Sequence, residues 1–205
     1  MPFEGHAKTL TFGLGLETPW SYTPPSYKKI KIQMISLILG GMYSGKSTEL
    51  MRQMDRYDRA GETTMTYKYK KDVRKGEDRA HMVSSHNGVH RAGVPIESLR
   101  SEPILPGTVY GIDEGQFIDG LVEFAESAAN QGCIVIISAL NSDFRRNPFD
   151  NIQNLISKAE NIQTLHAICH KCKKDASFTK RIVEGEEIEM IGAEDMYVAV
   201  CRKCF

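Results

Sequence analysis

Ile35-Ser36-Leu37-Ile38-Leu39-Gly40-Gly41-Met42-Tyr43-Ser44-Gly45-Lys46-Ser47 is the stretch that decides the fold of this 205-residue chain. A short, mostly apolar run leads into a glycine-rich turn, and a segment with helical periodicity follows it. We predict a strand over 32–39 and a helix over 47–60, in which Leu50, Met51 and Met54 share one face. Strand, turn and helix in this order are typical of an α/β domain with a parallel sheet.

The same alternation continues along the chain. Strands are predicted at 63–69 and 108–112 and a helix at 118–130, and the apolar run 133–140 indicates a strand buried on both faces. Asn87-Gly88, within 83–89, predicts a hairpin turn. After about residue 160 we predict a smaller module with short strands at 178–183 and 187–191, joined by a turn at Glu184-Gly185-Glu186.

Composition excludes several classes of protein. The 26 basic and 26 acidic side chains cancel, so the whole-molecule field typical of nucleic-acid or membrane-surface proteins is absent. No apolar stretch approaches the ~20 residues of a membrane span, and the N-terminus lacks the pattern of a signal peptide. We therefore expect a cytoplasmic protein that binds neither membrane nor nucleic acid. In a reducing compartment, clustered cysteines more often hold a metal than form disulfides.

The glycine-rich turn has the spacing G-x-x-x-x-G-K-[ST] of a phosphate-binding loop. Glycines let successive backbone N–H groups point at phosphate oxygens, and the following helix contributes its positive end. Lys46 is expected to reach the β and γ phosphates, and Ser47 to ligate magnesium. The alternative is an ordinary turn with a solvated lysine. We predict that Mg-ATP binds to Gly40, Gly41, Met42, Tyr43, Ser44, Gly45, Lys46 and Ser47.

An acid pair follows the strand predicted at 108–112. Asp113 is placed to hold magnesium directly or through water, and Glu114 to accept a proton from the group that attacks the γ-phosphate. Two acids that cap a helix would give the same pattern. The motif does not say whether Glu114 acts on an alcohol, as in a kinase, or on water, as in an ATPase.

Two cysteine pairs lie near the C-terminus, Cys169-His170-Lys171-Cys172 and Cys201-Arg202-Lys203-Cys204, with 28 residues between them. Two C-x-x-C turns supply four thiolates, which complete a tetrahedral structural zinc site without an open position. Redox-active dithiols are the competing interpretation. Residues 169–205 carry seven basic and seven acidic side chains, a balance that argues against a nucleic-acid-binding ribbon.

With these motifs the chain resembles the type II thymidine kinase family, of cellular and poxvirus type, over about residues 32–205. The resemblance rests on residues 39–50, 111–117 and 144–149, on Thr179-Lys180-Arg181 and on both cysteine pairs. It implies transfer of the γ-phosphoryl group of Mg-ATP to the 5′-hydroxyl of thymidine, giving thymidine 5′-phosphate. It also implies a homotetramer that is inhibited by thymidine triphosphate.

The resemblance further implies roles for individual residues. Glu114 matches the catalytic base and Asp113 the magnesium-linked acid, while Gln116, Asp72 and Arg74 match the nucleotide side of the site. On the thymidine side it implies stacking on Phe144, and contacts from Met42, Phe117, Leu140, Phe149, Thr179, Tyr197 and a lid formed by Ile188, Glu189, Met190, Ile191 and Gly192. From the residues alone, Arg74 is equally a solvated loop arginine, and Phe117, Leu140 and Phe149 are equally core residues.

We therefore expect a RecA-like P-loop α/β domain over 31–160 and a zinc-ribbon and lid module over 161–205. Residues 1–30, which contain half of the eight prolines, are expected to form an extension without regular structure. Asn141-Ser142 departs from the family, which usually has an acidic pair there. Two rival functions remain: a zinc-containing P-loop ATPase that acts on nucleic acid, and an inactive nucleotide-binding scaffold.

Overall fold

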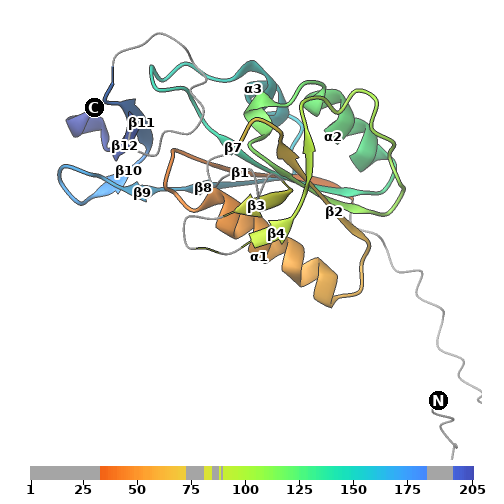
Figure 1. Cartoon of the computed structure of the whole chain (residues 1–205). Coiled ribbons are helices and arrows are strands. Elements are labelled where there is room, and N and C mark those ends of the chain that lie inside the picture. The colour runs from red at the N-terminus through yellow and green to blue at the C-terminus, as the bar shows by residue number, and fades with distance from the viewer. Residues whose placement is uncertain (1–32, 73–80, 85–87, 89, 184–195) are drawn as a thin grey trace, which may run out of the picture. The chain divides into compact units, whose positions relative to one another are not determined.

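A six-stranded parallel sheet forms the centre of the computed structural model, which describes residues 33–72, 81–84, 88, 90–183 and 196–205 (Figure 1). The strand order is β5-β2-β6-β7-β1-β8, and every pairing within this sheet is parallel. The strands are β1 (Met34–Gly40), β2 (Thr64–Tyr69), β5 (Val94–Ile96), β6 (Val109–Asp113), β7 (Ile134–Leu140) and β8 (Asn161–Leu165). The central strands β1, β6 and β7 are mostly buried, as their apolar runs require.

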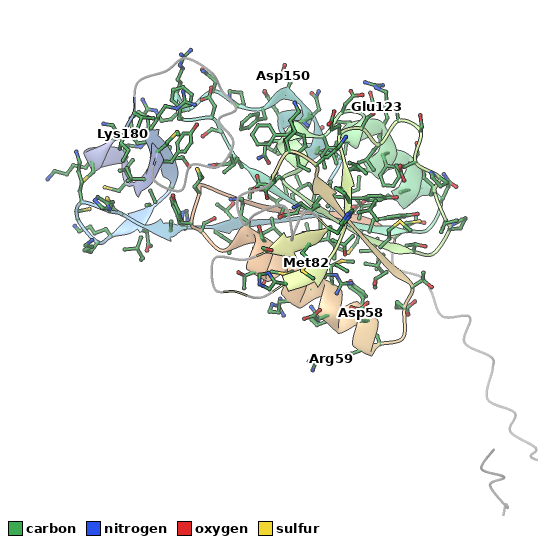
Figure 2. The ribbon with its side chains drawn as sticks, viewed as in Figure 1. Asp58, Arg59, Met82, Glu123, Asp150 and Lys180 are labelled. Atoms are coloured by element: carbon green, nitrogen blue, oxygen red, sulfur yellow. The ribbon has the colours of Figure 1, made fainter. Side chains whose placement is uncertain are left out.

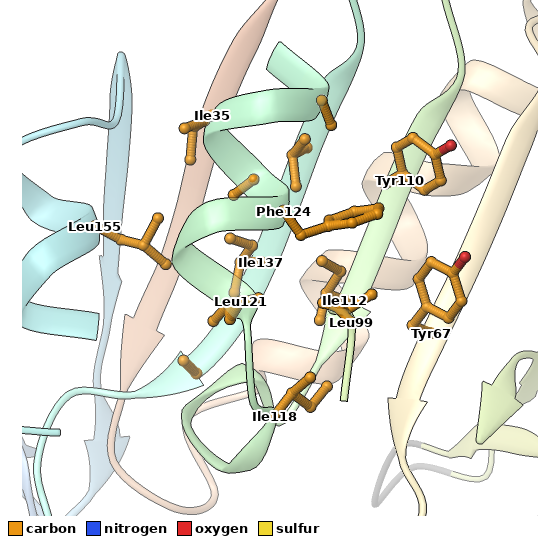
Figure 3. Packing of buried hydrophobic residues seen from close by; sticks show 14 of the residues in the cluster. Ile35, Tyr67, Leu99, Tyr110, Ile112, Ile118, Leu121, Phe124, Ile137 and Leu155 are labelled. Carbon is orange, nitrogen blue, oxygen red and sulfur yellow. The ribbon is translucent and has the colours of Figure 1, made fainter. Parts of the chain in front are cut away.

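Helices cover both faces of this sheet (Figure 1). On one face lies α1 (Lys46–Arg59), whose Leu50 and Met54 pack with Ile38, Val109 and Ile136. On the other lie α2 (Leu121–Asn130) and α3 (Asp150–Ile156). Figure 3 shows Leu121 and Phe124 of α2, with Leu155 of α3, packed over the strand residues on that side. Both helical layers bury an apolar stripe, which is the main source of stability in such folds.

Smaller hairpins complete the described part of the chain. β3 (Met82–Ser84) and β4 (His90–Ala92) pair antiparallel, as do β9 (Ala167–Ile168) with β10 (Asp175–Ala176) and β11 (Phe178–Arg181) with β12 (Tyr197–Val200). Two short 3₁₀ helices, η2 (Gly115–Phe117) and η4 (Arg202–Cys204), follow β6 and β12. β9 to β12 share a small core of their own, formed by Ala167, Cys169, Ala176, Ala199 and Val200.

One arginine holds the β3–β4 hairpin against α1. Arg91 of β4 bonds to the carboxylate of Asp58 at 2.6 Å and to Asp55 at 3.1 Å, and its Nε donates to Thr66 of β2 at 2.9 Å. Figure 2 shows Asp58 at the end of α1 near the hairpin that carries Met82. The side chain of Arg91 is only 14% exposed, so these bonds link three elements in a partly desolvated place.

The sequence predicted most of the central elements correctly. The predicted strands at 32–39, 63–69, 108–112 and 133–140 and the helix at 47–60 correspond to β1, β2, β6, β7 and α1. The helix predicted from residue 118 begins at Leu121, because Gly120 takes a left-handed φ of 71° and η2 precedes it. The strand predicted at 178–183 ends at Arg181, and its antiparallel partner is β12.

The sequence analysis did not anticipate β5, α3, β8, β9, β10 or β12. The strand predicted at 187–191 and the extension 1–30 lie outside the described residues. Within the described ranges, no helix is long and apolar enough to cross a membrane.

Candidate active site and metal centre

The carboxyl ends of the parallel strands bring most of the predicted nucleotide-binding residues together. Gly40 ends β1, Asp113 ends β6 and Asp72 follows β2. Leu140, predicted on the thymidine side, ends β7 at the same edge. In open parallel sheets this edge is where ligands bind, because loops and helix N-termini converge there. Arg74, predicted beside Asp72, lies outside the described residues.

The glycine-rich loop connects β1 to α1 in a tight turn. A Cβ on Gly40 would lie 2.5 Å from the carbonyl oxygen of Leu165, so only glycine fits beside β8. Gly45, directly before α1, has a φ of 86°, which favours glycine as well. The Ser44 hydroxyl and the buried Lys46 ammonium both donate to the carbonyl oxygen of Gly41, at 2.8 and 2.9 Å. These bonds hold the turn closed and place Lys46 within the loop.

Three acids gather beside this loop. Oxygens of Asp72, Asp113 and Glu114 lie within 4.8 Å of one another. The Ser47 hydroxyl donates to Asp113 Oδ1 at 3.0 Å, so the first turn of α1 is joined to the end of β6. Carboxylate and hydroxyl oxygens are the ligands that Mg²⁺ prefers, and this donor set therefore fits a magnesium ion.

Glu114 takes a left-handed conformation that is unusual for a residue with a side chain, with φ 54° and ψ 41°. Strain of this kind costs about 1–3 kcal/mol and concentrates at functional sites. Gln116 holds the Glu114 side chain, because its Nε2 donates to Glu114 Oε2 at 2.6 Å while its Oε1 accepts from the backbone N–H of Leu140 at 3.0 Å. Asn151 of α3 donates to the carbonyl oxygens of Gly115 and Gln116, and these bonds tie η2 to α3.

The aromatic residues predicted on the thymidine side form two pairs. Phe117 and Phe149 meet edge to face with ring centroids 5.8 Å apart, and both pack against the core of the α2 and α3 layer. Phe144 and Tyr197 form the second pair, with centroids 6.4 Å apart. The two interpretations of Phe117 and Phe149, pocket wall and core, are both compatible with this packing.

Thr179 joins the glycine-rich loop to the hairpin that carries Tyr197. Its hydroxyl accepts from the backbone N–H of Met42 at 2.9 Å, and the Tyr43 hydroxyl donates to the carbonyl oxygen of Tyr197 at 3.2 Å. Met42, Thr179 and Tyr197, which lie far apart in the sequence, are therefore brought together. The predicted lid residues, Ile188–Gly192, lie outside the described residues.

Asp143 organises the loop that carries Phe144. Its Oδ1 accepts from the backbone N–H groups of Arg145 and Asn147 at 2.8 and 2.7 Å, and its Oδ2 accepts from Asn147 Nδ2 at 3.1 Å. This carboxylate follows directly after Asn141-Ser142, the pair that departs from the pattern expected from the resemblance. The loop that carries Phe144 therefore contains a buried acid, Asp143, directly after Ser142.

The structure brings all four predicted metal ligands into one cluster. The sulfur atoms of Cys169, Cys172, Cys201 and Cys204 lie within 4.8 Å of one another, and all four thiols are free. Cys172 Sγ and Cys201 Sγ are 3.5 Å apart, near the separation of about 3.8 Å that a tetrahedral site with Zn–S bonds of about 2.3 Å requires. The donor set and its spacing fit zinc.

Electrostatics in the cluster also favour a cation. The backbone N–H of Cys172 lowers the pKa of the Cys169 thiol, whereas a hydrogen bond with the Cys201 thiol raises the pKa of Cys204 to about 12. The Cys201 thiol, whose own pKa is lowered by its bond with the Cys172 thiol, therefore opposes ionisation of Cys204. A divalent metal relieves this repulsion and allows all four to bind as thiolates.

Three buried polar residues at the site were not assigned a role from the sequence. Lys68 of β2 is 4% exposed and donates to the carbonyl oxygen of Asp72 at 2.8 Å. Ser138 of β7 donates to Asp113 Oδ1. The Arg181 guanidinium lies 3.9 Å from the centroid of Phe144 and donates to the Tyr197 hydroxyl. The sequence could have indicated a role for Ser138, because it is the polar residue in an otherwise apolar strand.

The parallel sheet and the position of its glycine-rich loop place the chain among the P-loop α/β proteins. A family model described as thymidine kinase matches residues 33–205. Because this match covers most of the chain, the chain belongs to the thymidine kinase family, as its motifs predicted.

Individual relatives agree with this family. Thymidine kinases of monkeypox virus and of vaccinia virus (strain Western Reserve) are each 47% identical over 173 residues, which are 83% of this chain and 96% of each relative. The thymidine kinase of myxoma virus (strain Lausanne) is 45% identical over 173 residues, 83% of this chain and 95% of the relative.

Proposed function

We propose that the cluster of Asp72, Asp113 and Glu114 beside the glycine-rich loop is the centre at which this chain phosphorylates thymidine. Phosphorylation of thymidine follows from membership of the family and from the named relatives. The observation that carries the assignment of the centre is the Ser47–Asp113 bond, because it joins the phosphate loop to the acids. We infer that ATP is the phosphoryl donor.

In this proposal the glycine-rich loop and the acids have different roles in binding ATP. The N–H groups of residues 40–47 and the Lys46 ammonium bind the phosphates, and Ser47 with Asp113 holds Mg²⁺. When bound, the magnesium ion neutralises charge that develops on the transferred phosphoryl group. Asp72 and Gln116 line the same edge, and Arg74 is proposed to approach the triphosphate.

Glu114 is proposed as the general base. Its carboxylate removes the proton from the 5′-hydroxyl of thymidine as that oxygen attacks the γ-phosphorus. The bond from Gln116 Nε2 fixes the orientation of the carboxylate, and the backbone at Glu114 is held in a left-handed conformation. A base held in this way loses little orientational freedom in the transition state.

Thymidine is proposed to stack on Phe144. Stacking of a base on an aromatic ring is worth about 1–3 kcal/mol and does not discriminate between bases. Discrimination is therefore assigned to the surrounding residues: Met42, Phe117, Leu140, Phe149, Thr179, Tyr197 and the segment Ile188–Gly192. The bonds of Thr179 and Tyr43 support this proposal, because they connect the phosphate loop to the thymidine side.

We also infer that the four-cysteine cluster holds a structural zinc ion. Four sulfur ligands leave no open position for catalysis, and a small core such as that of β9 to β12 gains stability from a metal. The division into a nucleotide-binding part over 31–160 and a zinc-ribbon and lid part over 161–205 is proposed on the same basis.

Further properties are proposed from the family alone. These are a homotetrameric assembly, feedback inhibition by thymidine triphosphate, and a cytoplasmic location, which would keep the cysteine thiols reduced.

The proposal is tested by ADP release from Mg-ATP with four additions: no acceptor, thymidine, deoxycytidine and single-stranded DNA. We expect thymidine to accelerate ADP release and the other additions to leave a low basal rate. Thymidine 5′-phosphate should form in equal amounts with ADP. Release that needs no nucleoside, or that DNA stimulates, would replace the kinase assignment with the ATPase rival.

A further inference from the structure

Ser138 places a hydroxyl group in the middle of β7, a mostly buried and otherwise apolar strand. It lies in β7 between Ile137 and Ala139, is completely buried, and donates to Asp113 Oδ1. The register explains the contact: Ile112 of β6 pairs with Ile137 of β7, so the next residues along the two strands, Asp113 and Ser138, are neighbours. A serine at this depth is retained only if its hydroxyl is bonded.

Asp113 Oδ1 therefore receives two hydroxyl bonds from different elements. One comes from Ser138 of β7 and the other from Ser47 of α1, at 3.0 Å. Two donors on one oxygen fix the rotation of the carboxylate about its Cβ–Cγ bond. The two bonds differ in one respect: Ser47 belongs to the phosphate-binding loop and is itself a proposed magnesium ligand, whereas Ser138 belongs to the sheet.

We propose that Ser138 is a positioning residue that holds the Asp113 carboxylate in the orientation that magnesium requires. This inference rests on the proposed function, since it assigns Asp113 to the metal. Ser138 holds Asp113 from the rigid sheet, so the carboxylate keeps its orientation while Ser47 exchanges partners as the metal binds and leaves. Groups that orient a metal-linked acid typically change metal affinity by about 10–100-fold when they are removed.

The alternative is that Ser138 only satisfies its own hydroxyl. Its removal would then change stability without changing metal binding. Ser36 offers a matched control, because it is also a buried serine in a central strand, β1, and its hydroxyl accepts from Asn161 Nδ2 at 2.9 Å. Asn161 begins β8, at the end of the sheet away from the acids.

The experiment compares the wild-type chain with Ser138→Ala and Ser36→Ala. Mn²⁺ binding in the presence of ADP, followed by electron paramagnetic resonance, reports metal affinity without turnover. The Mg²⁺ dependence of thymidine phosphorylation at saturating ATP is the second readout. For Ser138→Ala we expect the half-saturating metal concentration to rise about tenfold in both assays, with the KM for thymidine unchanged. Ser36→Ala should follow the wild-type curves.

Superimposable metal curves for Ser138→Ala and the wild type would overturn the inference, and so would an equal rise in Ser36→Ala. If Ser138→Ala does not fold, Ser138→Thr, which keeps the hydroxyl, is measured against Ser138→Cys, which replaces it with a weak donor. Wild-type Mn²⁺ affinity in Ser138→Cys would then overturn the inference. A wild-type chain that binds Mn²⁺ and ADP but does not phosphorylate thymidine would refute the proposed function instead.

Discussion

Gly40→Ala is expected to damage both the stability and the chemistry of the site. Gly40 pairs with Leu140 on one side and with Leu165 on the other, so its backbone is fixed by two strands. The added Cβ would lie 2.5 Å from the carbonyl oxygen of Leu165 and 2.6 Å from Ser44 Oγ. Because the shortest Cβ contacts in proteins are near 3.0 Å, the loop or β8 must move by about 0.5 Å.

The magnitude follows from this displacement. Overpacking of this kind costs about 1–3 kcal/mol. In a domain of this size, a loss of about 2 kcal/mol lowers Tm by about 4–8 °C. Misplacement of a catalytic site by about 1 Å costs about 100-fold in rate. We therefore expect kcat to fall by about tenfold or more, since the shift lies in the phosphate-binding loop.

The assay is thermal unfolding together with steady-state thymidine phosphorylation. Gly93→Ala is the control, because its Cβ would lie 3.2 Å from a methyl group of Val83, outside the glycine-rich loop, and a side chain can move where backbone cannot. We expect its Tm to change by less than about 2 °C and its activity to stay unchanged. A Gly40→Ala chain as stable and active as the wild type would refute this reasoning.

Three further predictions concern the metal centre, the buried lysine and the β3–β4 hairpin. Cys172→Ser should remove most of the zinc measured by elemental analysis and lower Tm, and full zinc content with an unchanged Tm would contradict the structural role. Lys68→Met should lower kcat/KM for ATP about tenfold, because the bond to the Asp72 carbonyl is lost; kinetics at the wild-type level would argue against it. Arg91→Met should lower Tm by about 2–4 °C near pH 7. Arg91 lowers the pKa of Asp58, so the ion-pair part of this stabilisation is present above the ordinary aspartate value of 3.8 and is lost as the pH falls below it. The difference in Tm between variant and wild type should therefore shrink at low pH, down to the part that comes from the bond to Thr66.

Local patterns were sufficient to predict the central fold. The apolar runs of β1 and β7 and the glycine-rich loop between β1 and α1 specify their own structure, because buried strands and tight turns constrain residue type. By contrast, α3 has seven residues and β8 is an edge strand with exposed positions, so neither has a strong periodicity. β5 and β12 are short and depend on pairing with distant segments.

The site residues fall into the same two groups: those that a local motif predicts, and those that come together only through contacts between distant segments. Lys46, Ser47, Asp113 and the cysteine pairs belong to motifs with fixed spacing, and the structure brings the members of each motif together. The contacts of their supporting residues cannot be read from a motif, even for Arg181, which belongs to one of the stretches that carry the resemblance. Ser138 contacts Asp113 because two strands share a register, and Arg181 contacts Phe144 because a hairpin folds back on a loop.

The most direct test of the account is single-turnover transfer of the γ-phosphoryl group from Mg-ATP to thymidine by Glu114→Gln, with thymidine binding measured by calorimetry. The account predicts that thymidine still binds while transfer slows by about 10²–10⁴-fold, the usual contribution of a general base. Transfer at a rate near that of the wild type, with thymidine bound, would contradict the assignment of Glu114 and the mechanism proposed around it.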